Sequence, residues 1–224
     1  MQTIKDIRNY FLTSMYKGNF TRDRTGCSTI ELIGASFEAD QPAIFGTPNT
    51  EYIEKEIAWY DSESLNIHHM DDPPKQWIAT AGPDGAINSN YGWMLYSKAN
   101  HEQYLNLLQE LIHNPDTRRA CAVYNRPSIW HEYNMNGRND FICTNAVTYY
   151  IRGSQLICVV QMRSNDAVYG YKNDYAWQAE VCERLIEDYN NHGNPPPDTQ
   201  LESYKIYWQV QNLHVYERHF HLIK

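Results

Sequence analysis

The feature that most constrains the fold of this chain is a pair of β-rich runs joined by two residues. Residues 144–152 and 155–161 are dominated by β-branched, aromatic and other apolar side chains, and Gly153-Ser154 separates them. This pattern is typical of two strands connected by a tight turn. The sequence therefore predicts a β-hairpin over residues 144–161.

Further helices and strands surround the hairpin in an irregular order. Helical spacing of apolar residues, or a high β propensity, predicts helices over residues 51–60, 101–113 and 175–189 and strands over residues 28–34, 120–124 and 205–211. Because helices and strands do not alternate regularly, the expected fold class is α+β. We expect a mixed sheet flanked by helices rather than a doubly wound parallel sheet.

We interpret the chain as one domain that spans residues 1–224. Residues 69–75 and 190–199 are rich in Pro, Asp, Asn and Gly, which predicts loops. Neither loop is long enough to be a clear linker between domains. The length of 224 residues is sufficient for one domain with a sizeable core.

Composition excludes several classes of protein. The chain has 27 acidic residues against 19 Lys and Arg, and a net charge of -8 argues against a protein that grips nucleic acid directly. No apolar stretch approaches membrane-spanning length, and the N-terminus has no signal-peptide core. The five cysteines form no CxxC pair, which favours free thiols in a reducing compartment. We therefore expect a cytoplasmic protein that does not bind a membrane.

One cysteine differs from the others in its surroundings. Cys121, Cys158 and Cys182 lie within apolar patterns and are predicted to be small buried side chains. Cys143 instead lies at the mouth of a predicted strand, shortly after a polar run. A side chain there can be exposed and yet held rigidly, so Cys143 is the candidate nucleophile. Adjacent histidines such as His68 and His69 point in different directions, and we predict no metal site.

Arginines gather at the ends of predicted strands. They are Arg22 and Arg24 before Thr25-Gly26, Arg118-Arg119 before a strand, and Arg163-Ser164 after the hairpin. The planar guanidinium suits phosphate because it donates two parallel hydrogen bonds. The alternative is that each arginine pairs with a nearby carboxylate at the surface. Local sequence leaves both possibilities open.

Several segments, taken together and in order, resemble the thymidylate synthase family. They are residues 161–166 with Gly170 and 173–176, residues 23–26, Arg118-Arg119, Tyr91-Gly92, Glu56 in a helix before a Trp, and residues 214–216. The resemblance runs from about residue 20 to the end of the chain. Within the family it is strongest, over residues 29–37, 87–93, 163–178 and 213–220, to bacteriophage members that hydroxymethylate deoxycytidylate (dCMP).

The resemblance implies a fold, a reaction and a cosubstrate. The fold is that of a thymidylate synthase, and Cys143 is the nucleophile that adds to C6 of the pyrimidine. This addition makes C5 able to attack the one-carbon unit of 5,10-methylenetetrahydrofolate, so that covalent catalysis splits one hard step into easier ones. Glu56 manages protons near C5, and Trp77, Tyr91 and Asp166 lie toward the folate and its water network.

The resemblance also assigns residues to the nucleotide. Arg24, Arg163 and Ser164 bind its phosphate, Asn165 also contacts the substrate, and His214 and Tyr216 hold the sugar hydroxyl. The family forms homodimers with shared sites, so that Arg118 and Arg119 reach the phosphate in the partner subunit. From the composition we expect no membrane or nucleic acid to take part, and the resemblance implies a reaction in the cytoplasm of an infected host cell.

Asp174 is expected to choose the base. Thymidylate synthases carry Asn here, and an amide can donate to O4 of uracil and accept from N3–H. A carboxylate only accepts, which suits the C4 amino group of cytosine and a protonated N3. The alternative is that Asp174 is the N-cap of the helix predicted over residues 175–189.

Three departures from the family bear on the product. The chain ends eight residues after Tyr216, Thr144 stands where thymidylate synthases have His, and Pro74 replaces a Trp three residues before Trp77. A more open site suits a reaction that ends with attack by water, which gives a hydroxymethyl product. Two alternatives stay open: a dCMP methyltransferase, and a nucleotide-binding dimer that has lost catalysis.

Overall fold

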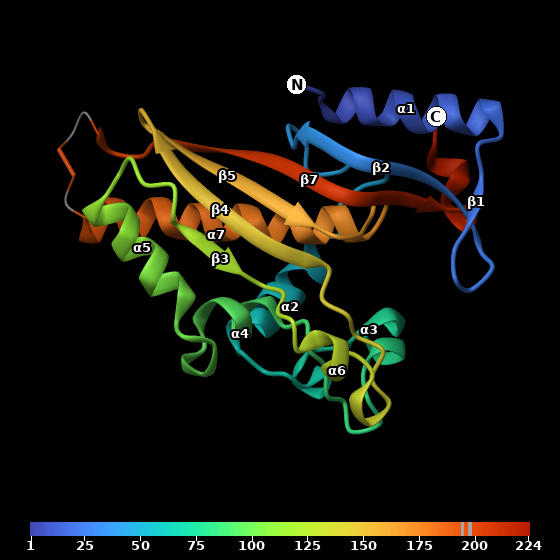
Figure 1. Ribbon diagram of the computed structural model, residues 1–224, viewed down its shortest axis with the longest axis horizontal. Coiled ribbons are helices and arrows are strands. Elements are labelled where there is room, and N and C mark those ends of the chain that lie inside the picture. The colour runs from blue at the N-terminus through green and yellow to red at the C-terminus, as the bar shows by residue number, and fades with distance from the viewer. Residues whose placement is uncertain (194, 197–198) are drawn as a thin grey trace. The chain divides into compact units, whose positions relative to one another are not determined.

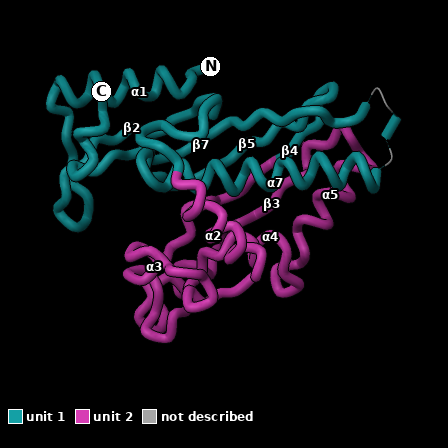
Figure 2. The backbone as a smooth tube through the Cα atoms, turned by 180° about the vertical axis from the view of Figure 1, so that it is seen from behind, with its two compact units in different colours: residues 1–48, 149–224 teal, residues 49–148 magenta. Residues whose placement is uncertain are grey.

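The chain divides into two compact units (Figure 2). The computed structural model describes residues 1–193, 195–196 and 199–224. Unit 1 comprises residues 1–48 and 149–224, and unit 2 comprises residues 49–148. Among the described residues, no helix is both long and apolar enough to cross a membrane. The assignment of residues 1–224 to a single catalytic domain stays a prediction.

Unit 1 is built on a mixed sheet (Figure 1). The strand order is β1-β2-β7-β5-β4, with β6 beside β7. The central strand β7 pairs antiparallel with β2 and parallel with both β5 and β6. The predicted α+β class with a mixed sheet is therefore confirmed. The strands are β1 (Thr21–Arg22), β2 (Ser28–Glu38), β4 (Thr144–Arg152, which enters from unit 2), β5 (Gln155–Met162), β6 (Asn165–Asp166) and β7 (Ser203–Tyr216).

The predicted hairpin is confirmed with almost the predicted bounds. Strand β4 ends at Arg152 and β5 begins at Gln155, and the two are neighbours in the sheet. The turn between them places Gly153 at a φ of 60°, a left-handed conformation that glycine adopts without strain.

Helix α7 (Gly170–His192) packs against β5, β6 and β7 (Figure 1). It buries an apolar stripe that includes Val181, Cys182, Leu185 and Tyr189. The helix begins at Gly170 rather than at residue 175, so Asp174 lies inside it. The alternative that Asp174 is an N-cap is therefore wrong. The helix also continues to His192, into the loop predicted over residues 190–199, which lies partly outside the described residues.

Helix α1 (Ile4–Lys17) was not among the predicted elements. Thr3 and Asp6 form a capping box at its start, and Gly18 ends it in a left-handed conformation with a φ of 66°. Its buried side chains, Ile4, Ile7, Phe11 and Ser14, recur at helical spacing. Unit 1 ends in the 3₁₀ segment η5 (Glu217–Leu222).

Unit 2 consists mainly of helices. Those predicted over residues 51–60 and 101–113 are confirmed as α2 (Thr50–Asp61) and α5 (Gln103–His113). The predicted loop over residues 69–75 connects η1 (Ile67–His69) to α3 (Lys75–Thr80). Strand β3 (Cys121–Val123) pairs antiparallel with the first part of β4. The other segments are α4 (Tyr91–Tyr96), η2 (Lys98–Asn100), α6 (Ile129–Glu132) and η3 (Met135–Gly137).

Helix α4 approaches α2 closely because its second residue is glycine. A Cβ atom added at Gly92 would lie 1.9 Å from the backbone oxygen of Tyr60, at the end of α2. Any side chain at this position would therefore push the two helices apart. This packing gives a physical reason for the Tyr91-Gly92 pair noted in the sequence.

The cysteines follow the prediction with one exception. Cys158 and Cys182 are buried, as predicted. Cys121 is exposed, so the prediction that it is buried is wrong. The side chains of β3 alternate, with Ala122 buried and both Cys121 and Val123 directed outward, because only one face of this short strand packs on the core.

Candidate active site

Cys143 immediately precedes β4 in unit 2. Its side chain is half-buried, and its Sγ lies 3.8 Å from the carbonyl oxygen of Phe141. Asp140, three residues before it, and Thr144, the next residue, are almost fully buried. The expectation that the thiol is partly exposed is confirmed, and its role as the nucleophile stays a prediction.

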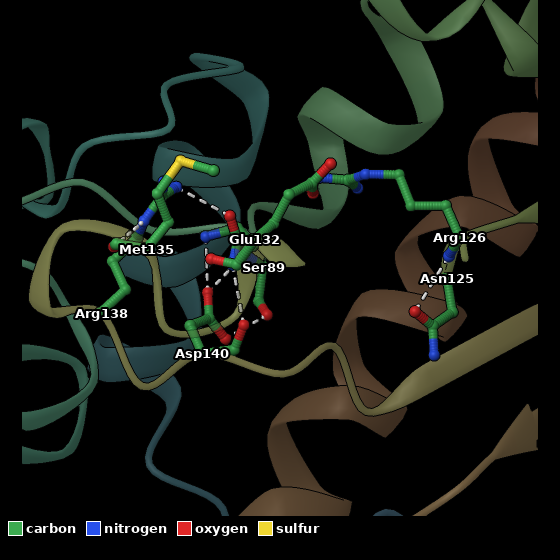
Figure 3. Close-up of polar contacts among 8 residues, drawn as sticks. Ser89, Asn125, Arg126, Glu132, Met135, Arg138 and Asp140 are labelled. Atoms are coloured by element: carbon green, nitrogen blue, oxygen red, sulfur yellow. Dashed lines mark hydrogen bonds and ion pairs between the residues drawn. The ribbon is translucent and has the colours of Figure 1, made fainter. Parts of the chain in front are cut away.

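On the N-terminal side of the cysteine, the carboxylate of Asp140 binds the segment that precedes α4 (Figure 3). It accepts hydrogen bonds from the backbone N–H groups of Asn88 (2.6 Å) and Ser89 (2.8 Å) and from the hydroxyl of Ser89 (2.5 Å). The Asn88 side chain donates in return to the carbonyl of Asp140 at 2.8 Å. Burial raises the pKa of Asp140, and these hydrogen bonds act in the opposite direction.

On the C-terminal side, Thr144 makes a second connection to the same segment. Its hydroxyl donates to the hydroxyl of Tyr91, the first residue of α4, at 2.9 Å. The Tyr91 ring stacks on Tyr60 of α2, with ring centroids 5.3 Å apart. Residues 88–91 therefore bind the chain both before and after Cys143, which limits the positions available to the thiol. Tyr91 itself is only 5 % exposed.

Glu56 lies on α2 in a small cluster of hydrogen-bond donors. Its side chain is 5 % exposed, and its Oε1 accepts from the Tyr52 hydroxyl at 2.6 Å and from the Trp77 indole N–H at 2.9 Å. Burial raises the pKa of Glu56, while the two hydrogen bonds lower it. Raising the pKa of a carboxyl group makes it a stronger base and a weaker acid, which suits a group that takes up and returns a proton.

The paired arginines before β3 have different surroundings. Arg119 is bound to Glu110 of α5, with a nitrogen–oxygen distance of 3.1 Å. Arg118 is exposed, and within the described part of the chain it has no ion-pair partner. The alternative of a surface ion pair therefore fits Arg119, whereas Arg118 is available to an external anion.

Two further arginines of unit 2 bind neighbouring groups (Figure 3). Arg126 forms an ion pair with Glu132 and lies over the ring of Trp93. Arg138 donates to the side-chain oxygen of Asn88 at 2.8 Å and so joins the contacts around Asp140. Both guanidinium groups are therefore engaged by side chains of unit 2.

In unit 1, Arg24 lies in the turn between β1 and β2. Asp23 shapes this turn by accepting from the Thr25 hydroxyl (2.7 Å) and from the backbone N–H groups of Thr25 (2.8 Å) and Cys27 (3.0 Å). These bonds, the one from the Thr25 hydroxyl first, lower the pKa of Asp23. The turn presents Arg24 at the surface.

The motif that begins at Arg163 joins the sheet at its centre. Arg163 and Ser164 connect β5 to β6, where Asn165 is paired with Leu213 and Asp166 with His214 of β7. The backbone N–H of Ala167 donates to the carbonyl of His214 at 2.8 Å. Sheet pairing therefore sets the predicted phosphate-binding segment beside the predicted sugar-binding histidine.

His214 and Tyr216 project from the same face of β7. Their rings meet edge to face, with centroids 4.9 Å apart. Burial lowers the pKa of His214, which favours the neutral ring. The His214 Nδ1 lies 3.1 Å from the Asn212 side-chain oxygen. Since that oxygen only accepts, Nδ1 carries the hydrogen, and Nε2 is left as an acceptor for a hydroxyl.

Asp174 lies in the second turn of α7, beside the start of β6. Its Oδ2 accepts a hydrogen bond of 2.7 Å from the side-chain N–H of Asn165. Asn165 is 4 % exposed, whereas Asp174 is half-buried. The predicted base-reading residue is therefore supported by a residue that was expected to contact the substrate.

Each unit gathers part of the predicted site. Unit 1 brings together Asn165, Asp166, Asp174, His214 and Tyr216, and unit 2 brings together Glu56 with Trp77, and Cys143 with Tyr91 through Thr144. Sequence reasoning missed the residues that support them: Tyr52, Asn88, Ser89 and Asp140. Only Tyr52 had a local signal, because it lies four residues before Glu56 on a predicted helix.

Comparison with known proteins identifies the family of the chain. The sequence profile of the thymidylate synthase family matches residues 8–224. The chain belongs to the thymidylate synthase family. Within it, the chain is 46 % identical to the deoxycytidylate 5-hydroxymethyltransferases of Enterobacteria phages T6 and T4 over 222 residues, which cover 99 % of this chain and 89 % of each relative. It is 22 % identical to a thymidylate synthase of Francisella tularensis subsp. holarctica over 232 residues, which cover 96 % and 81 %.

Proposed function

We propose that this thymidylate synthase family member hydroxymethylates dCMP at C5, with 5,10-methylenetetrahydrofolate as the one-carbon donor. The name of the T6 and T4 relatives, at 46 % identity, supports this activity. The observation that carries the choice of substrate is the carboxylate of Asp174 in the family's base-reading position. We further propose that the reaction takes place in the cytoplasm of an infected host cell.

Asp174 suits cytosine because every atom that it presents is an acceptor. The C4 amino group of cytosine donates, and N3 also becomes a donor once C6 has been attacked and the ring takes up a proton. A carboxylate can accept from both groups, and the charge-assisted hydrogen bonds stabilise the developing positive charge. Uracil presents an acceptor at O4, which would face the carboxylate without a proton between them. The side-chain N–H of Asn165 donates to Asp174 Oδ2 and leaves Oδ1 as a further acceptor.

Cys143 is proposed to start the reaction. Its thiolate adds to C6, so that C5 gains electron density and bonds to the donated carbon. Glu56 is proposed to direct the proton transfers near C5, which its raised pKa favours. Loss of the C5 proton, with cleavage of the bond between the donated carbon and the folate nitrogen, releases tetrahydrofolate and leaves an exocyclic methylene group on C5. Water adds to this group to give the hydroxymethyl product. The Cys143 sulfur then leaves C6 and the aromatic ring returns.

The exposed apolar side chains of unit 2 fit an aromatic cosubstrate. Ile78 is 56 % exposed and Trp130 is 70 % exposed, and Trp77 is half-buried with its indole N–H bound to Glu56. Such side chains favour the stacking of flat rings. The folate would supply a carbon at the oxidation level of formaldehyde. Trp77, Tyr91 and Asp166 are proposed to hold it and the associated water.

The nucleotide phosphate is proposed to bind Arg24, Arg163 and Ser164, together with Arg118 and Arg119 of a partner subunit in a homodimer. The exposure of Arg118 supports this role, since its guanidinium is available outside its own fold. A mixture of Cys143→Ser and Arg118→Ala proteins tests the shared site. If each site takes residues from both subunits, mixed dimers hold one intact site, and activity recovers to about a quarter of the parent value. Without sharing, the mixture gains nothing over its components.

The proposed function is tested by incubating the protein with methylenetetrahydrofolate and either dCMP or deoxyuridylate (dUMP), and by identifying the products by mass. We expect 5-hydroxymethyl-dCMP from dCMP and no product from dUMP. A methyl product from dCMP would make the protein a methyltransferase and would overturn the water step alone. Nucleotide binding without any product would favour a dimer that has lost catalysis.

A further inference from the structure

We infer that Asn165 is a positioning residue that fixes the orientation of the group at position 174, and through it the choice between cytosine and uracil. This inference rests on the proposed function. It also revises the expectation from the family resemblance, because Asn165 acts through Asp174 instead of contacting the nucleotide.

Burial separates the roles of the two side chains. Asn165 is 4 % exposed, and its Oδ1 is buried without a hydrogen-bond partner among the described residues. Its Nδ2 donates to Asp174 Oδ2 at 2.7 Å. Asn165 therefore has no open surface for a nucleotide, and its one side-chain hydrogen bond goes to the carboxylate that is proposed to read the base.

The surroundings of Asn165 hold its amide in place. Its backbone belongs to β6 and is paired with Leu213 of the central strand. Gly170 lies against the side chain, since a Cβ atom there would be 3.0 Å from Asn165 Nδ2 and 3.7 Å from Asp174 Oδ2. A glycine at the start of α7 thus leaves room for the amide to approach the carboxylate. The strand on one side and the helix on the other keep the donor directed at Asp174.

This geometry has a consequence for any amide placed at position 174. In an Asp174→Asn protein, the donor of Asn165 requires an acceptor, so the oxygen of the new amide turns toward Asn165 and its NH₂ takes the place of Oδ1. If position 165 carries a carboxylate instead, the requirement is reversed. The NH₂ of the new amide then turns toward that carboxylate, and the amide oxygen takes the other place. The residue at position 165 therefore determines which way round the group at position 174 meets the base.

The test compares Asp174→Asn with the double variant that combines Asn165→Asp and Asp174→Asn. The measured quantity is the ratio of the equilibrium dissociation constants of dCMP and dUMP, which does not depend on the product formed. We expect Asp174→Asn to shift this ratio toward dUMP, and the double variant to shift it back toward dCMP by about tenfold, the effect of one well-placed hydrogen bond. Equal ratios in the two variants would overturn the inference.

A second variant covers the case in which the double variant does not fold. Asn165→Ala keeps the Asp174 carboxylate but removes the donor that holds it. We expect kcat with dCMP to fall about tenfold while KM for dCMP changes little, because the proposed phosphate contacts remain. The matched control is Gln178→Leu, which removes another buried amide from α7, one whose polar atoms have no hydrogen-bond partner among the described residues. If Asn165→Ala and Gln178→Leu have the same kinetics, the inference is wrong.

Failure of the inference is distinguishable from failure of the proposed function. If the parent protein binds dCMP in preference to dUMP but makes no hydroxymethyl product, the proposed reaction fails and the inference about Asn165 can still be measured by binding. If the parent makes the product but both variants with an amide at position 174 show one and the same base preference, the reaction stands and the role of Asn165 falls.

Discussion

The two units hold their functional side chains by different means. In unit 1, Asp166, His214 and Asp174 project from strands and a helix whose backbone pairing sets their spacing. In unit 2, Cys143 lies outside regular structure and is supported by buried side chains, above all Asp140, that bind distant backbone. The first arrangement depends on the sheet as a whole, and the second on a few individual hydrogen bonds.

This difference indicates where single substitutions act. A side chain on a paired strand keeps its position when a neighbouring side chain is changed, because the ladder of backbone hydrogen bonds remains. A loop fixed by one buried carboxylate loses its geometry when that carboxylate is removed, since the backbone donors are left unpaired. We therefore expect substitutions at supporting residues to be more damaging in unit 2 than in unit 1.

The largest effect is expected at Cys143, the residue that the unit 2 arrangement supports. Replacement by Ser removes the thiolate, and turnover of dCMP falls below detection while dCMP binding is retained. The control is Cys121→Ser, which changes an exposed cysteine of the same unit and leaves activity at the parent level. Turnover by the Cys143→Ser protein would refute the assignment of the nucleophile.

Glu56→Gln separates the function of unit 2 from its stability. We expect kcat to fall by about 10²-fold or more, because the general acid–base group is lost. Burial raises the pKa of Glu56, so the folded state binds this proton more tightly than the unfolded state does. The stability of the parent therefore decreases as the pH rises from the usual pKa of a Glu side chain through the raised pKa of Glu56.

The amide in Glu56→Gln keeps the acceptor for Tyr52 and Trp77 but carries no charge. Above the raised pKa, the variant should be more stable than the parent by about 1 kcal/mol. Urea unfolding at several pH values measures the pH dependence of the parent's stability and the difference in stability between the variant and the parent. A variant that is less stable than the parent above that raised pKa would contradict the account of Glu56.

Asp140→Ala and Asp23→Ala test the comparison between the units directly. Each carboxylate accepts several hydrogen bonds, but Asp140 is buried in unit 2 and Asp23 lies in an exposed turn of unit 1. We expect Asp140→Ala to lower the free energy of unfolding by about 3 kcal/mol, because two buried N–H groups lose their acceptor. Asp23→Ala should leave it nearly unchanged. Equal losses in urea unfolding would remove the distinction drawn between the two units.

A small effect of the opposite sign is expected at Gln178 in unit 1. Its side chain is 1 % exposed, and its two polar atoms have no hydrogen-bond partner among the described residues. Leu has a similar volume and no polar atom to desolvate, so Gln178→Leu should raise the free energy of unfolding by about 1 kcal/mol. A loss of stability in thermal or urea unfolding would mean that the amide is paired in solution.

Sequence reasoning was most successful where local patterns determine structure. The hairpin was predicted because its two β-rich runs flank Gly153-Ser154, and helices α2 and α5 because their apolar spacing is helical. The start of α7 was missed because residues 170–174 contain Gly, Asn and Asp, which are poor helix formers. Tertiary contacts outweigh that propensity, since Gly170 and Asp174 both lie against Asn165.

The supports of the nucleophile could not be predicted for a different reason. Asp140 binds Ser89, which is 51 positions away in the sequence, and no periodic pattern connects the two. The candidate residues themselves were found through the family resemblance, which identifies positions but not the contacts that hold them. The exposure of Cys121 could not be predicted either, because three residues are too few for the alternation of apolar and polar side chains to show which face of the strand is exposed.

The central claim, that the chain makes hydroxymethyl-dCMP by adding water to a covalent Cys143 intermediate, is tested most directly by running the reaction in water enriched in heavy oxygen. The parent protein is incubated with dCMP and methylenetetrahydrofolate, and the product is examined by mass spectrometry. The account predicts 5-hydroxymethyl-dCMP with solvent oxygen in its new hydroxyl group. A methylated nucleotide, or a hydroxymethyl product without solvent oxygen, would contradict it.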